Sequence, residues 1–226
     1  MTANATSPAA TAAAVPSPGD ASPLPSPLKG DPAMVGIPNV IAGATGLGLV
    51  TIGVFPAAAA GAALPILLSA TSVGMLIATI WAAALGQNVT ATLYGTILGF
   101  YISYVALGIG LRHGWYGIPA ADASNAVEVY LICWLVAIGA LTLATLRMPS
   151  SFTLLFGLVD LALILLLIAS YSGSAAVSKA GGWVVMAFVA EAIYIYFHVM
   201  LLATGGKGLP MGKPLLGSAD RNRLPA

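Results

Sequence analysis

The chain has 226 residues, of which 59% are hydrophobic and only 7% are charged, and its mean hydropathy is +0.96. A soluble domain carries about 25% charged residues, so this composition excludes an ordinary soluble protein and is typical of an integral membrane protein. The net charge is +1 and no basic block is present, which argues against a nucleic-acid partner.

The two ends of the chain differ from the apolar remainder. Residues 1–30 are rich in Ala, Pro, Ser and Thr and contain no long apolar run. A signal peptide would need a basic start and an apolar core, and neither is present. This composition predicts a disordered N-terminal tail, and residues 205–226 are predicted to form a polar C-terminal tail.

The first membrane span is predicted to begin beside Asp31. About 18 residues without a charge follow, which is enough to cross a bilayer at roughly 1.5 Å per residue. Pro32 and Pro38 fit a helix start, because a proline there removes an N–H group that would lack a partner anyway. Asp31 is expected to accept hydrogen bonds from the free amides that follow, at the entrance of the molecule.

Five further apolar stretches are predicted to cross the membrane. Short turns, an interfacial segment at 112–117 and a small-residue link at 172–181 separate them. The predicted spans are 63–85, 89–111, 125–146, 152–171 and 182–202. Together with the first span they predict an all-α integral membrane protein, with six transmembrane helices in one bundle over residues 31–204.

The positive charges predict how the bundle is oriented. An even number of spans places both termini on one side of the membrane. The charges on that side are Lys29, Arg147, Lys207, Lys213, Arg221 and Arg223. Only Arg112 and Lys179 fall on the opposite side. Since positive residues concentrate in the cytoplasm, the chain is predicted to be a multi-pass protein of the cell membrane with both termini cytoplasmic.

Two faces of the span 89–111 carry distinctive residues. One face has small side chains four residues apart, which predicts a seam where another helix approaches: Gly95, Gly99 and Ser103. A second face follows helical spacing and brings tyrosines into the membrane: Tyr94, Ile97, Tyr101 and Tyr104. Their hydroxyl groups need partners, so this face is a candidate lining of a passage. The alternative is that these hydroxyls bond neighbouring backbone.

Two acidic residues are predicted to lie near the middle of the membrane. Asp160 is about eight residues into the fifth span and Glu191 about nine into the sixth. At roughly 1.5 Å per residue, both positions are near the midplane of the membrane. Two carboxyl groups in contact disfavour double ionisation, so one of them is expected to hold a proton. His198 lies seven residues after Glu191, on the helix face of Tyr194, and extends a possible proton relay. The alternative is that these groups hydrogen-bond helices together at a subunit seam.

Several motifs resemble the acetate transporter family, also called the YaaH or SatP family. The stretch 31–37, Asp-Pro-Ala-Met-Val-Gly-Ile, resembles the family signature N-P-A-P-L-G-L. Further matches are Gly86 with Asn88, Thr92-Leu93-Tyr94, Phe100-Tyr101, Val129-Tyr130-Leu131, Leu146-Arg147, and Gly182-Trp183 with Ala192-Ile193-Tyr194. The likeness covers all six spans, roughly residues 31–215.

The resemblance implies a six-helix protomer, a ring of six protomers and a separate pathway for acetate in each protomer. It implies a narrow apolar constriction at Val40, Ile97 and Val159, where this chain has smaller side chains than its relatives. With Asp31 at the entrance, the remaining pathway residues are expected to be Tyr94, Tyr101 and Tyr194. Relatives tend to have small or neutral polar residues where this chain has its two acidic residues, so those belong to this sequence alone.

These observations together predict membrane transport of acetate or a related short carboxylate, coupled to protons. The sequence contains no phosphate-binding loop, no metal-binding cluster and no spaced catalytic set, so no enzyme activity, cofactor or metal is predicted. Two alternatives remain at this point. One is an uncoupled channel for small anions or neutral solutes, and the other is a membrane scaffold that transports nothing.

Overall fold

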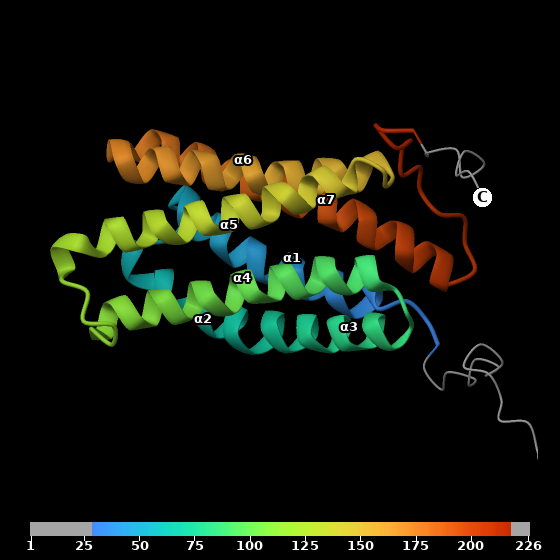
Figure 1. Ribbon diagram of the computed structural model, residues 1–226, viewed down its shortest axis with the longest axis horizontal. Helices are drawn as coiled ribbons and strands as arrows, with labels where there is room; N and C mark the ends of the chain where they lie inside the picture. The colour runs from blue at the N-terminus through green and yellow to red at the C-terminus, as the bar shows by residue number, and fades with distance from the viewer. Residues whose placement is uncertain (1–28, 218–226) are drawn as a thin grey trace, which may run out of the picture.

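The structure, a computed structural model, describes residues 29–217 of the chain (Figure 1). The predicted N-terminal tail therefore falls almost entirely outside the described residues, whereas only residues 218–226 of the predicted C-terminal tail do. Within the described part, the elements are helices joined by turns. They are α1 (Ala33–Ile52), η1 (Ala57–Ala62), α2 (Ala63–Pro65), η2 (Ile66–Thr71), α3 (Ser72–Ala84), α4 (Asn88–His113), η3 (Ala120–Asp122), α5 (Ala123–Thr145), α6 (Ser150–Ser172) and α7 (Ala175–Ala203).

Six helical stretches among residues 29–217 are long and apolar enough to cross a membrane, which confirms the predicted fold class. The second stretch, Ala63–Ala84, combines α2, η2 and α3, and the fourth, Ala120–Thr145, combines η3 and α5. The helices alternate in direction along the bundle (Figure 1). Both ends of the described chain therefore lie at one end of the bundle, called here the termini end, and the opposite end is the far end.

The six spans form a ring, because each span packs against a neighbour on either side. The order around the ring is α1, α7, α6, α5, α4 and α3, with α3 returning to α1. The contact between α4 and α5 is the least extensive of the six. A ring of this kind leaves its interior to side chains that point inward from all the spans.

Glycines let α1 approach its neighbours closely. A Cβ atom on Gly36 would lie 2.5 Å from Cε1 of Tyr94, so the tyrosine ring on α4 occupies the space that a side chain would need. A Cβ atom on Gly182 of α7 would lie 2.8 Å from the backbone nitrogen of Ile52. Small residues of this kind allow helix backbones to pack tightly in a membrane. The glycine of the 31–37 motif is thus explained by the position of a tyrosine.

The start of α1 follows the prediction in part. Oδ1 of Asp31 accepts a hydrogen bond from the backbone N–H of Ala33 at 2.9 Å, as expected for a residue before a helix. Pro32 occupies the N-cap position, but Pro38 lies inside the helix. The expectation that both prolines mark the start was therefore wrong for Pro38, because α1 has already begun at Ala33.

Aromatic side chains connect α4 to α5, the two neighbours with the least extensive contact in the ring. The hydroxyl of Tyr130 donates to the carbonyl oxygen of Phe100 at 2.7 Å, and Nε1 of Trp134 donates to Oγ of Ser103 at 3.1 Å. The Trp134 ring also covers Gly99, where a Cβ atom would lie 3.0 Å from it. The predicted seam on α4 therefore receives an aromatic side chain of α5, while Gly95 lies toward Thr79 on α3.

The predicted link at 172–181 is much shorter in the structure. The connection consists of Gly173 and Ser174, and α7 begins at Ala175. Oγ of Ser174 accepts from the N–H of Val177 at 3.4 Å, which caps the new helix, and Gly173 has a φ of +64° that suits glycine. The predicted linker is wrong over 175–181, because an alanine-rich stretch behind a serine cap favours helix.

The segment 205–217 packs against the bundle. From the end of α7 it crosses the termini end to the turn between α5 and α6 (Figure 1). The N–H of Ser151 donates to the carbonyl oxygen of Met211 at 3.2 Å, and the N–H of Leu216 donates to that of Leu146 at 2.9 Å. This part of the predicted polar tail is therefore attached to the helices.

Candidate functional site

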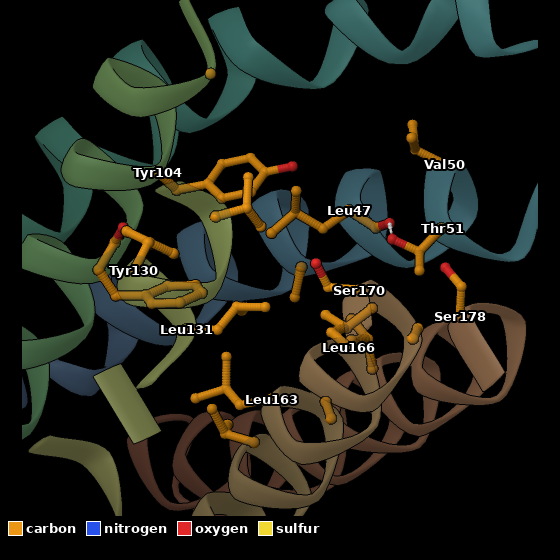
Figure 2. Close-up of a pocket in the computed structure, with 18 of the residues that line it drawn as sticks. Leu47, Val50, Thr51, Tyr104, Tyr130, Leu131, Leu163, Leu166, Ser170 and Ser178 are labelled. Carbon is orange, nitrogen blue, oxygen red and sulfur yellow. Dashed lines mark hydrogen bonds between the residues drawn. The ribbon is translucent and has the colours of Figure 1, made fainter. Parts of the chain in front are cut away.

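A large cavity opens toward the far end of the bundle (Figure 2). It has a volume of about 650 Å³, and its walls come from α1, α4, α5, α6 and α7. Most of the wall is apolar, with Leu47, Leu131, Leu163 and Leu166 among the side chains drawn in Figure 2. This space is called here the far-end cavity.

Hydroxyl groups gather on the wall of the far-end cavity nearest the far end. Thr51, Ser170 and Ser178 come from α1, α6 and α7, and Figure 2 shows their side chains on one side of the space. The hydroxyl of Thr51 donates to the carbonyl oxygen of Leu47 at 2.7 Å, so its lone pairs remain free to accept. The wall thus changes from apolar in the middle of the bundle to polar toward its end.

Two cations lie at the far end, next to this polar wall. Arg112 is in the last turn of α4, and its Nη1 would be 3.1 Å from a Cβ atom on Gly61. Lys179 is in the first turns of α7, and its Cε would be 3.8 Å from a Cβ atom on Gly53. Each of them directly follows a residue that lines the cavity, Leu111 or Ser178. Positive charge at a mouth raises the local concentration of anions.

A second cavity, called here the termini-end cavity, opens at the other end. Its volume is about 350 Å³, and α1, α4, α6, α7 and Met211 form most of its wall. Its polar side chains lie near the mouth. They are Asp31, Gln87, Thr90, Tyr94 and His198.

The two cavities meet at an apolar junction. Ile97 on α4 and Phe188 on α7 line both of them, and these side chains are only 7% and 6% exposed. Val40 lines the termini-end cavity beside them and Val159 lines the far-end cavity. All four belong to or pack against one apolar cluster. The residues predicted to form the constriction therefore lie at or next to this junction.

Phe188 was not predicted from the sequence, although a signal for it exists. Phe188, Ala192, Ile195 and Val199 recur at the spacing of one helix face, and all four line the termini-end cavity. Glu191 lies on a different face of the same helix. The stripe contains the aromatic residue that the structure places at the junction.

The tyrosines of α4 face the cavities. Tyr94 lines the termini-end cavity, and Tyr101 and Tyr104 line the far-end cavity. The ring of Tyr104 extends into this space in Figure 2. Within the described part of the chain, no hydrogen bond engages any of these three hydroxyl groups, in contrast to Tyr130, which bonds the backbone of Phe100. The three hydroxyls are therefore available to a molecule in the cavities.

Asp160 lies outside both cavities, in the seam between α5 and α6. Its Oδ2 accepts a hydrogen bond from the hydroxyl of Thr142 at 2.6 Å, while its Oδ1 is buried without a partner among residues 29–217. A Cβ atom on Gly139 would lie 3.9 Å from Oδ1, which again places the carboxyl group against α5. A hydrogen bond between helices is thus the contact that the structure gives this residue.

Glu191 and Tyr194 also lie outside the two cavities. They line an outer groove formed by α6, α7 and residues 210–215. Oε1 of Glu191 is buried and has no partner within residues 29–217, and the hydroxyl of Tyr194 donates to the carbonyl oxygen of Pro210 at 2.5 Å. Of the predicted relay, His198 alone lines a cavity. Its Nδ1 is 2.7 Å from the carbonyl oxygen of Leu209, so Nδ1 must donate.

A third carboxyl group within the spans, that of Glu128, was not among the predicted site residues. It is only 9% exposed, and its Oε1 accepts from the hydroxyl of Ser170 at 2.9 Å, across the seam of α5 and α6. The signal was present, since Glu128 is an acidic residue within the predicted span 125–146. No group of three or more His, Cys, Asp and Glu residues in the described part of the chain could hold a metal ion.

A ring of membrane-length helices around two cavities defines a multi-pass α-helical membrane protein. The family model of the GPR1/FUN34/yaaH family matches residues 13–205, and the chain belongs to this family. The resemblance inferred from the motifs is thereby confirmed.

Proteins similar to the chain include one of solved structure and two from yeast. The solved structure of the bacterial acetate channel SatP matches with a TM-score of 0.72 and 23% identity, over 81% of this chain and 99% of that one. At this identity the likeness shows the fold. Two proteins of Saccharomyces cerevisiae, accumulation of dyads protein 2 and ammonia transport outward protein 2, are 36% and 34% identical over 123 residues. That match spans 51% of this chain but only 42% of each yeast protein.

Proposed function

We propose that this protein carries acetate or a related short carboxylate across the cell membrane. The observation that supports this proposal best is the pair of cavities that open toward opposite ends of the bundle and share Ile97 and Phe188. Substrate would enter a cavity, cross the apolar junction and leave through the other cavity. A structural neighbour is titled an acetate channel, which agrees with this substrate class.

The charges and hydroxyl groups suit a small anion. Arg112 and Lys179 at the far end would attract a carboxylate, and the hydroxyl groups of Tyr101 and Tyr104 can donate to its oxygens. Asp31 at the other mouth would repel it by about 1 kcal/mol or less through water. Two cations and two tyrosine donors are therefore found together on the far-end side.

We further propose that a proton accompanies the substrate. Moving a carboxylate through an apolar junction costs far more free energy than moving the neutral acid, because a charge loses its hydration there. Of the groups proposed for coupling, His198 faces the passage, while Asp160 and Glu191 would act through the seams of α6. This proposal therefore requires that protonation of Asp160 or Glu191 changes how α6 packs against its neighbouring helices.

The assembly and its orientation are part of the proposal. Large apolar side chains are exposed along α3 and α5, where lipid or a second copy of the chain would cover them. A homo-oligomer, with six copies as the family resemblance implies, would bury part of this surface. The excess of lysine and arginine at the termini end favours a cytoplasmic position for that end.

An uncoupled channel for small anions or neutral solutes is the second candidate. The far-end cavity is mainly apolar, and one relative is named for outward ammonia transport, so an uncharged solute would also suit this passage. A scaffold without transport is the third candidate, and it leaves the cavities without a role.

One experiment separates these candidates. Purified protein in liposomes would be supplied with labelled acetate or labelled methylamine, with and without an imposed pH gradient. Accumulation of acetate only with the gradient supports coupling, and equilibration without any effect of the gradient supports a channel. Passage of methylamine but not of acetate favours a neutral solute. No flux above that of empty liposomes would contradict transport.

A further inference from the structure

The segment 205–217, called here the strap, crosses the termini end of the bundle (Figure 1) and contributes Met211 to the wall of the termini-end cavity. It is attached by contacts with α6, α7 and the turn between α5 and α6. The side chains of His198 and Tyr194 donate to the carbonyl oxygens of Leu209 and Pro210. The remaining two attachments are the backbone hydrogen bonds of Met211 and Leu216 described above.

One side chain of the strap enters the passage. Met211 lines the termini-end cavity and packs against the apolar group of Ile37, Ala192 and Ile195. Leu215 and Leu216, further along the strap, are exposed instead. Methionine is flexible and fills irregular apolar spaces, so it suits a closure that must form and break.

The composition of the strap keeps its attachment weak. It has glycine at 205, 206, 208, 212 and 217 and proline at 210 and 214, and it contains no helix or strand. Gly205 and Gly212 have φ values of +81° and +75°, so the chain bends on either side of Met211 at residues suited to such angles. A segment with few buried contacts and glycine bends opens at low cost.

We propose that the strap is the gate of the passage at the termini end, with Met211 as the side chain that closes it. Docked, as in this structure, the strap narrows the mouth of the termini-end cavity. Substrate passes when the strap lifts about its glycine bends at Gly205 and Gly212. The role as a gate rests on the proposed transport function.

A reversible cross-link tests whether the strap must move. A Cβ atom on Gly212 would lie 3.2 Å from Cβ of Ser150, close to the roughly 3.5–4.5 Å found in disulfides. The variant combines Ser150→Cys and Gly212→Cys with Cys133→Ala, in full-length protein in liposomes. We expect oxidation to abolish most acetate flux and reduction to restore it. The two single-cysteine variants should not respond to oxidant. Full flux in the cross-linked protein would make the strap a fixed wall and overturn the proposal.

A second test does not depend on transport. Ala192→Cys, combined with Cys133→Ala, places a thiol on the wall of the termini-end cavity. Adding Met211→Ala should speed its modification by a water-soluble thiol reagent several-fold, whereas adding Leu216→Ala should leave the rate unchanged. Equal rates of thiol modification in Ala192→Cys alone, with Met211→Ala and with Leu216→Ala would overturn the proposal that Met211 closes the cavity. If wild-type protein carries no acetate, the proposed function fails, and the modification rates still decide whether Met211 closes this cavity.

Discussion

Ile97 on α4 and Phe188 on α7 are the two side chains shared by the far-end and termini-end cavities. Each cavity reaches one end of the bundle, so a molecule crossing the ring would have to pass these two side chains. Both are almost completely buried and belong to one apolar cluster. Substitution of either side chain is therefore expected to alter passage between the two cavities.

Enlarging Ile97 should block the passage. In the variant Ile97→Trp, the indole ring would fill the junction, because packed interiors have no free space for it. We expect acetate flux in liposomes to fall to the level of empty liposomes, while membrane insertion stays normal. The matched control is Ile102→Trp on the same helix, where the side chain is 44% exposed. Normal flux in Ile97→Trp would remove this residue from the pathway.

Shortening Phe188 should widen the junction. In Phe188→Ala we expect propionate and butyrate to pass faster relative to acetate, since the ring no longer limits substrate width. The loss of a buried aromatic ring should lower the free energy of unfolding by about 3 kcal/mol, measurable as a lower Tm in detergent. Phe197→Ala is the control, because Phe197 is exposed on the same helix. An unchanged ratio of butyrate to acetate flux would show that another side chain sets the width.

Neutralising Asp31 should preserve or improve transport. Asparagine can still accept the hydrogen bond from the N–H of Ala33, but it removes a charge that repels anions by about 1 kcal/mol or less. Asp31→Asn should therefore leave flux intact or lower the apparent KM for acetate. Asp31→Ala also removes the hydrogen bond from Ala33 and should lower the free energy of unfolding by about 1 kcal/mol, as measured by thermal unfolding. Loss of flux in well-folded Asp31→Asn would contradict the entrance role.

Removing either membrane carboxyl group should uncouple transport. Asp160→Asn keeps an oxygen that can accept from Thr142, and Glu191→Gln keeps the size of the side chain. We expect both variants to assemble normally and to lose the accumulation of acetate that an imposed pH gradient drives. Thr142→Val is the control, since it removes the same hydrogen bond and should cost about 1–3 kcal/mol of stability without uncoupling. Gradient-driven accumulation retained by both carboxyl variants would assign these groups to helix packing alone.

The membrane spans were predictable from the sequence because hydropathy is a local property. Apolar stretches long enough for a bilayer need no knowledge of their neighbours, and six of them appear in the structure as helices. The hydrogen bond from Ala33 to Asp31 was likewise predictable, since it joins residues only two positions apart at the start of a helix. The family motifs added Val40, Ile97 and Val159, which lie at or beside the junction.

The tertiary structure decided which face of each helix points inward. These helices are apolar on every side, so periodicity in the sequence gives little indication of how each one is rotated about its axis. Packing of α6 turns Asp160 toward Thr142, and packing of α7 turns Glu191 and Tyr194 to an outer groove while Phe188 faces the cavities. The position of the strap also depends on side chains far away in the sequence. Contacts between distant segments set these features, and a reading of each segment alone does not contain them.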